Sequence, residues 1–117
     1  MQQSQLLIVA ADAPLKEHLA ACFAAYNVLE AQCEESAAYM LRRYEPAVVL
    51  QDFRLLEGTL ETGSPLQTLR GLISLAPHTK IVAIVEEGER GDAMRAIAHG
   101  ACDYFELPVD CEPLRFL

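Results

Sequence analysis

The sequence lacks an apolar run long enough to cross a membrane. A membrane-spanning helix needs about 20 consecutive apolar residues, whereas the longest apolar windows, LLIVAA and KIVAIV, have the length of strands. The first residues, MQQSQ, also lack the basic region and the following apolar stretch of a secretory signal. We therefore expect neither a membrane segment nor export.

Basic residues are scarce. The chain has 9 Lys and Arg against 17 Asp and Glu, which gives a formal net charge of −8. A domain that binds nucleic acid neutralises phosphate groups with Lys and Arg, so this balance argues against direct contact with nucleic acid. An ordinary requirement for solubility also accounts for the negative charge.

Familiar metal and catalytic motifs are missing as well. The four cysteines show neither C-x-x-C pairing nor the histidine spacing of zinc sites; they are Cys22, Cys33, Cys102 and Cys111. Two lie in helical patterns and fit small buried hydrophobic residues, so we expect no disulfides and a reducing, cytoplasmic setting. The three histidines do not cluster, and no G-x-S-x-G, P-loop or G-x-G-x-x-G occurs. We therefore expect that the domain is not an enzyme.

The sequence does contain an alternation of strand-like and helical patterns. With 117 residues, 52% of them hydrophobic, it suits one compact domain with a core. Apolar, strand-like runs occupy residues 6–10, 27–32, 47–52, 79–85 and 101–107. Helical spacing occupies residues 12–26, 34–46, 65–76 and 92–100, and an unfinished last helix begins near residue 110. Five apolar strands separated by helices predict a parallel sheet covered on both faces.

In such a sheet, chemistry is expected at the carboxyl ends of the strands. The run EPAVVLQD ends there on a lone carboxylate, Asp52, at the point where a loop begins. Ala10 and Ala11 follow the first strand-like run, and Asp12 after them suits the N-cap of the next helix. The remaining strand ends carry Val85, Glu86, Glu87, Glu106, Leu107 and Pro108.

Five segments carry a family resemblance, namely LLIV, LRRYEPAVVLQD, SLAPHTKIVAIV, MRAIAHGACDYF and LPVD. From Leu6 to its end, the chain resembles the receiver domain of bacterial two-component response regulators. The resemblance implies a flavodoxin-like (CheY-like) α/β fold, with a doubly wound, five-stranded parallel sheet of order 2-1-3-4-5 in three αβα layers. It also implies a single receiver-like domain over residues 1–117, with a truncated last helix, at the N-terminus of a longer regulator in the bacterial cytoplasm.

A finer resemblance lies in SLAPHTK, in RAIAHGACDYF and in the long loop after Asp52. These segments are similar to regulators associated with the exosortase (PEP-CTERM) system. Those regulators resemble sigma-54-dependent activators, in which an ATPase module and a DNA-binding helix-turn-helix follow the receiver. The finer resemblance therefore implies transcription regulation through an output domain.

The family resemblance assigns Asp52 to the phosphoacceptor position, but its chemical partners are absent. The partner positions fall on Ala10 and Ala11 (the acid pair), Val85 (the hydroxyl residue), Glu86 (a small residue) and Leu107 (the lysine), with Pro108 retained. Mg²⁺ is usually anchored by one or two carboxylates, so Asp52 alone leaves a weak site or none. Without metal, hydroxyl and lysine, the phosphorylated product would put about two negative charges beside Glu86 with little to balance them. We therefore expect no cofactor and no appreciable phosphorylation.

Several side chains are expected to surround Asp52. The candidate pocket residues are Asp12, Arg54, Glu86 and Pro108. Arg54 is close enough in sequence to pair with Asp52 or to replace the lost cation, and a purely structural role for Asp52 is the main alternative. Tyr104 matches the switch aromatic of receivers, and without a hydroxyl residue to draw it inward we expect a partly buried strand residue.

We also expect Val85 and Leu107 to be packed apolar residues, and Glu86 and Glu106 to point to solvent. Together these features favour a pseudo-receiver, which regulates an output domain by protein contacts without efficient phosphorylation. Two alternatives stay open: a phosphorylatable receiver that uses Asp52, and a small-molecule sensor that uses the vacated pocket.

Protein partners follow from the resemblance. It implies an output domain and a sensor kinase as partners. It also implies a homodimer through the fourth helix, the fifth strand and the fifth helix, a surface that includes Ala93 to His99 and Asp103 to Phe105.

Overall fold

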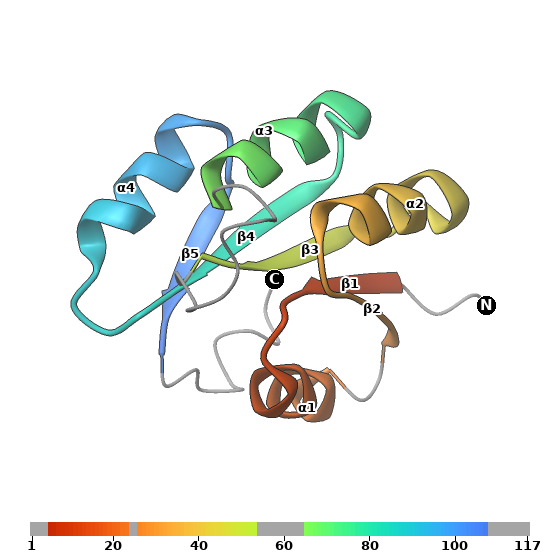
Figure 1. Cartoon of the computed structure of the whole chain (residues 1–117), viewed down its shortest axis with the longest axis horizontal. Coiled ribbons are helices and arrows are strands. Elements are labelled where there is room, and N and C mark those ends of the chain that lie inside the picture. The colour runs from red at the N-terminus through yellow and green to blue at the C-terminus, as the bar shows by residue number, and fades with distance from the viewer. Residues whose placement is uncertain (1–4, 24–25, 54–64, 108–117) are drawn as a thin grey trace.

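The computed structural model describes residues 5–23, 26–53 and 65–107. Strands and helices alternate along them in the order β1 (Gln5–Val9), α1 (Ala13–Cys22), β2 (Asn27–Ala31), α2 (Glu34–Tyr44), β3 (Val48–Asp52), α3 (Pro65–Leu75), β4 (Lys80–Val85), α4 (Arg90–Ala98) and β5 (Asp103–Glu106). All strand pairs are parallel, and the sheet order is β2-β1-β3-β4-β5 (Figure 1). The predicted α/β fold and sheet order are confirmed. The predicted last helix, from residue 110, lies outside the described residues.

Helices cover both faces of the sheet, with α2, α3 and α4 on one face and α1 on the other (Figure 1). Side chains alternate along each strand, so Leu7 and Val9 face the first group of helices while Leu6 and Ile8 face α1. This burial on both faces explains why the strands read as continuous apolar runs.

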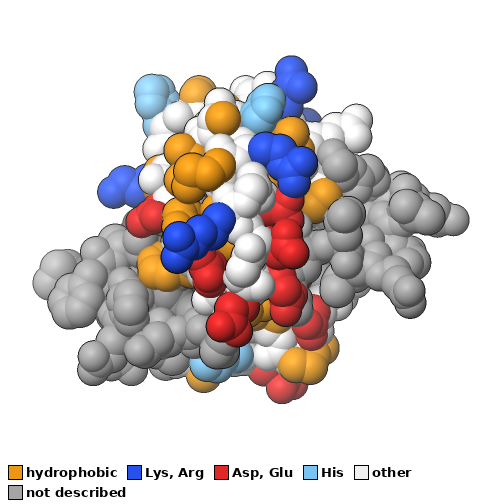
Figure 2. Space-filling view, turned by 90° about the vertical axis from the view of Figure 1, so that its left-hand side faces the viewer, with side chains coloured by type: hydrophobic (Ala, Val, Ile, Leu, Met, Phe, Trp, Pro, Cys, Tyr) orange, Lys and Arg blue, Asp and Glu red, His pale blue; other side chains and the backbone are white. Residues whose placement is uncertain are grey.

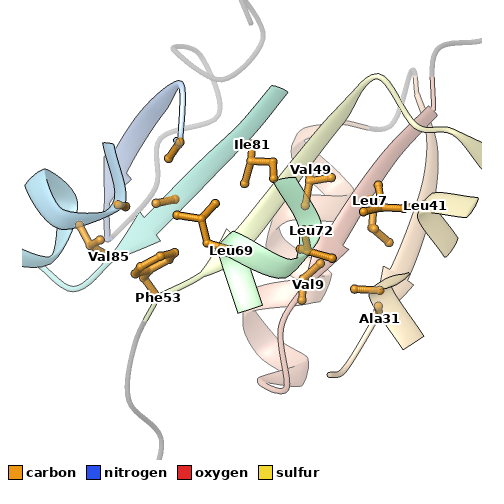
Figure 3. Packing of buried hydrophobic residues seen from close by; sticks show 14 of the residues in the cluster. Leu7, Val9, Ala31, Leu41, Val49, Phe53, Leu69, Leu72, Ile81 and Val85 are labelled. Carbon is orange, nitrogen blue, oxygen red and sulfur yellow. The ribbon is translucent and has the colours of Figure 1, made fainter. Parts of the chain in front are cut away.

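The core therefore has two parts. The α2–α4 cluster comprises Leu7, Val9, Ala31, Ala37, Leu41, Val49, Phe53, Leu69, Leu72, Ile81, Ala83, Val85, Ala93, Ala96 and Ala101 (Figure 3). The α1 cluster comprises Leu6, Ile8, Ala10, Leu15, Leu19, Cys22, Phe23, Leu50, Val82 and Ile84. Both clusters reach the carboxyl ends of the strands, so the site residues stand on a rigid base.

Two helix ends are set by single residues. Asp12 Oδ1 accepts a hydrogen bond from the Leu15 N–H at 3.4 Å and so caps α1, as predicted. α2 ends at Tyr44, because its C-cap residue, Glu45, has a left-handed φ of 47° and Pro46 then prevents the helix from continuing. Within the described residues, no helix is long and apolar enough to cross a membrane.

All four described helices differ from their predicted ranges by one or more residues, and two of the differences have a clear cause. α1 stops at Cys22 and not at residue 26, because Phe23 leaves helical geometry with ψ 38° and buries its ring in the α1 cluster. α4 starts at Arg90, two residues earlier than predicted. The Glu89 N–H donates to the Glu86 carbonyl at 3.0 Å, and this turn returns the chain to helical geometry at Arg90.

The cysteines also depart from the prediction. Cys22 is disulfide-bonded, so the expectation of no disulfides is wrong. Cysteine spacing along the chain does not report which sulfur atoms a fold brings together. Cys33 and Cys102 are free thiols. Because of this disulfide, the cysteines no longer support the expectation of a reducing, cytoplasmic setting.

Candidate functional site

The residues predicted to form a site lie at the carboxyl edge of the sheet. Parallel strands all end at the same edge, so residues far apart in the sequence come together there (Figure 1). The strand register sets Asp52 beside Ile84, and Val85 beside Glu106. The predicted residues at this edge are Ala10, Ala11, Asp12, Asp52, Val85, Glu86, Glu106 and Leu107. Arg54 and Pro108 lie outside the described residues.

Asp52 is the last residue of β3 and is half-buried. The Phe53 N–H donates to the Ile84 carbonyl at 2.8 Å, which fixes the backbone directly after the carboxylate. Among residues 5–23, 26–53 and 65–107, no three His, Cys, Asp or Glu side chains are grouped to hold a metal ion. The structure thus gives Asp52 a fixed place at a strand tip, without a metal-binding cluster in that part of the chain.

The positions of the acid pair provide no carboxylate. Ala10 is buried in the α1 cluster, and its N–H donates to the Ala31 carbonyl at 3.0 Å. Ala11 is exposed and carries only a methyl group. Asp12, one residue further along, directs one carboxylate oxygen to the N-terminus of α1.

Apolar side chains occupy the hydroxyl and lysine positions. Val85 is fully buried in the α2–α4 cluster (Figure 3). Leu107 is half-buried and packs against the α1 cluster. Its N–H donates to the Val85 carbonyl at 2.9 Å, so strand pairing continues past the end of β5. Tyr104, in β5, is half-buried and packs against the α2–α4 cluster.

The two glutamates at the edge differ from each other. Glu86 is exposed. Glu106, which we expected to point to solvent, has a side chain that is only 30% exposed and makes two contacts. Its Oε2 accepts a hydrogen bond from the Gly88 N–H at 3.4 Å, and its Oε1 lies 3.5 Å from Arg90 Nε.

Sequence reasoning missed Gln51, the residue before Asp52. Its side chain is 2% exposed, and Nε2 donates to the Pro65 carbonyl at 2.8 Å. Gln51 thereby joins the end of β3 to the first residue of α3. Oε1 is buried and accepts no hydrogen bond from the described residues. The sequence did contain a signal, namely a polar side chain within a largely apolar strand. A strand that is buried on both faces keeps such a side chain away from solvent, so the side chain needs a hydrogen-bond partner within the protein.

Negative charge predominates at this edge. Directly after β1, β3 and β4 and at the end of β5, the charged residues within the described ranges are Asp12, Asp52, Glu86, Glu87, Glu89, Arg90 and Glu106. Six are acidic and one is basic. Acidic side chains gather on the α4 and β5 side of the molecule, next to basic and hydrophobic ones (Figure 2). The excess of negative charge at the carboxyl edge of the sheet disfavours the approach of an anion.

No protein family model matches this chain, and no curated protein matches it. Solved structures do match. The receiver domain of NtrX from Brucella abortus is similar with a TM-score of 0.86 and 22% identity, over 95% of this chain and 92% of that chain. The receiver domain of TorR, the response regulator of the TMAO respiratory system, is similar with a TM-score of 0.83 and 18% identity, over 97% of this chain and 91% of that chain.

A longer NtrX structure from Brucella abortus shows how much of a regulator this fold occupies. Its TM-score is 0.87 at 22% identity, and the match covers 99% of this chain but 25% of that chain. Identities this low establish the architecture and not the chemistry. The chain has the fold of response regulator receiver domains.

Proposed function

We propose that the chain is a pseudo-receiver, a signalling domain of a bacterial two-component response regulator that acts through protein contacts without efficient phosphorylation. The observation that carries the proposal is that Asp52 stands at the strand tip while apolar side chains occupy the positions of the acid pair, the hydroxyl residue and the lysine, namely Ala10, Ala11, Val85 and Leu107. The receiver fold supports the signalling role, and the chemistry of the edge supports the loss of phosphorylation. The domain is, in this proposal, not an enzyme.

The residues at the edge do not fit Mg²⁺. This ion demands nearly octahedral oxygen coordination and is usually anchored by one or two carboxylates. Ala10 and Ala11 supply none, and one oxygen of Asp12 already accepts a hydrogen bond as the N-cap of α1. We therefore propose that Mg²⁺ binds weakly or not at all.

A phosphoryl group on Asp52 would also find neither a hydroxyl nor a lysine at the two family positions. The acyl phosphate would carry about two negative charges in place of the one on the carboxylate, at an edge with five other acids. Val85 has no hydroxyl to donate a hydrogen bond, and Leu107 has no charge. The loss of a single positioned donor typically costs about 3 kcal/mol of stabilisation, and here the metal, the hydroxyl and the cation are lost together.

The partners belong to the proposal as well. The longer NtrX structure, of which the match covers a quarter, supports placing the chain in a longer regulator. We propose further that the chain forms the N-terminal part of that regulator and acts on a transcriptional output domain. An exosortase-associated regulator is the specific form that we propose. Met94 and Ile97 of α4 are large, exposed apolar residues, and they support a homodimer surface around α4 and β5. We propose a location in the bacterial cytoplasm, with a sensor kinase as a further partner and no direct contact with nucleic acid.

Intact-mass measurement after incubation with Mg²⁺ and acetyl phosphate tests the proposal. We expect no phosphoryl adduct on the chain, and no thermal stabilisation by Mg²⁺ with beryllofluoride. An adduct that is abolished in Asp52→Asn would show a phosphorylatable receiver and refute the proposal. Thermal stabilisation by a metabolite, without an adduct, would instead favour the small-molecule sensor.

A further inference from the structure

The connection between β4 and α4 is a tight turn of residues 86–89. Its closing hydrogen bond runs from the Glu89 N–H to the Glu86 carbonyl at 3.0 Å. Gly88 has φ +86°, the left-handed value that the third position of a type II turn requires. This closing bond does not use the Gly88 N–H, which lies at the surface and can donate to another acceptor.

The acceptor comes from the neighbouring strand. Glu106 lies opposite Val85 in the sheet register, so its side chain leaves the sheet on the face covered by α4. From there Oε2 accepts the hydrogen bond of the Gly88 N–H at 3.4 Å. Oε1 lies 3.5 Å from Nε of Arg90, the first residue of α4. One carboxylate thus contacts both the turn and the helix that follows it.

The two contacts of the Glu106 carboxylate differ in how much they contribute to stability. Arg90 is 80% exposed, and ion pairs with such side chains contribute little. The hydrogen bond to Gly88 involves a charged acceptor and is the stronger contact. A negative charge beside the first turn of α4 is also favoured by the helix dipole. The side chain of the N-cap residue, Glu89, makes no capping hydrogen bond, and Glu106 places its negative charge near this end of the helix without capping it.

We propose that Glu106 holds the β4–α4 turn and the start of α4 in one position relative to β5. The carboxylate with its contacts to Gly88 and Arg90 is named the Glu106 bridge. The bridge connects the turn to the edge of the sheet through contacts in which neither Asp52 nor Val85 takes part. The α4 and β5 side of the domain (Figure 2) therefore keeps one arrangement in the absence of any modification. This inference goes beyond the proposed function and does not rest on it.

Amide hydrogen exchange of the whole chain, measured by NMR at Gly88 and corrected for the intrinsic rate, tests the bridge. Glu106→Ala removes both contacts, and we expect the Gly88 N–H to exchange about fivefold faster. Glu106→Gln keeps an acceptor oxygen but loses the charge, so we expect a smaller increase. Glu87→Gln is the matched control, because it removes one charge from the same turn and leaves the Glu106 carboxylate intact.

The inference is wrong if Gly88 exchanges equally fast in Glu106→Ala and in the parent chain, or if Glu87→Gln accelerates it as much. Thermal unfolding shows whether Glu106→Ala is folded. If it is not, Glu106→Gln takes its place, with an increase of less than fivefold as the expected result and no increase as the refuting one. A phosphoryl adduct on Asp52 would overturn the proposed function but would leave this measurement unaffected.

Discussion

Replacing Gln51 by leucine is expected to stabilise the domain. Leucine has a similar volume and no polar atoms, and the site is buried between β3 and α3. The substitution removes the hydrogen bond from Nε2 to the Pro65 carbonyl. It also removes Oε1, a buried acceptor that receives no hydrogen bond from the described residues. The outcome depends on which of these two effects is larger.

The magnitudes favour leucine. The lost hydrogen bond contributes about 1 kcal/mol, whereas a buried unsatisfied acceptor costs about 1–3 kcal/mol. Pro65 is the first residue of α3, where carbonyl groups accept hydrogen bonds within the helix, so its carbonyl is not left without a donor. We therefore expect Gln51→Leu to raise the free energy of unfolding by about 1 kcal/mol. Gln51→Ala is expected to lower it by about 2 kcal/mol, because it leaves a cavity.

Urea unfolding of the three chains at 25 °C, followed by circular dichroism, measures these differences. The slopes against urea concentration are expected to be equal, so the midpoints alone report the change in stability. If Gln51→Leu lowers the free energy of unfolding by more than about 1 kcal/mol, the reasoning is refuted. A buried water that donates to Oε1 would then be the natural explanation.

Two further predictions concern the core and the thiols. Leu72→Ala, at a fully buried position of α3, is expected to lower the free energy of unfolding by about 2–5 kcal/mol, against about 0.5 kcal/mol or less for the exposed Leu75→Ala. If urea unfolding shows that the two variants lose equal free energy of unfolding, the assignment of Leu72 to the core is contradicted. Hydrogen bonds with Ser36 lower the pKa of Cys33, whereas burial raises the pKa of Cys102. A lower pKa gives more thiolate at neutral pH, so iodoacetamide should modify Cys33 before Cys102, as mass spectrometry would show, and Ser36→Ala should slow the reaction of Cys33. Faster reaction of Cys102 would contradict this assignment.

The elements of the fold could be predicted from the sequence because their signals are local. KIVAIV is a short, β-branched apolar run, and it forms β4 at Lys80–Val85. The order of the strands could not be read in this way, because the apolar pattern shows that a strand is buried but not beside which strand it lies. That order came from the family resemblance, whereas the placement of Asp52, Val85 and Leu107 at one edge followed from the predicted parallel sheet.

The missed features depend on contacts between distant parts of the chain. The Glu106 bridge requires the register of β5 against β4 and the left-handed conformation of Gly88. The bond from Gln51 to Pro65 spans the segment between β3 and α3. The disulfide of Cys22 likewise depends on the folded arrangement. Local patterns carry no information about such pairings, so only the structure could show them.

The two outer strands of the sheet, β2 and β5, affect whether the chain aggregates at high concentration. β2 and β5 each pair on one side only within the described residues, and the free side of an outer strand can align an extended segment of another chain. Both strands are short, and they carry acidic side chains: Glu30 in β2, and Asp103 and Glu106 in β5. Two copies meeting edge to edge would also bring together chains that each have a net charge of −8. Fibrous aggregation by strand addition is therefore disfavoured, and assembly is left to the helical surfaces.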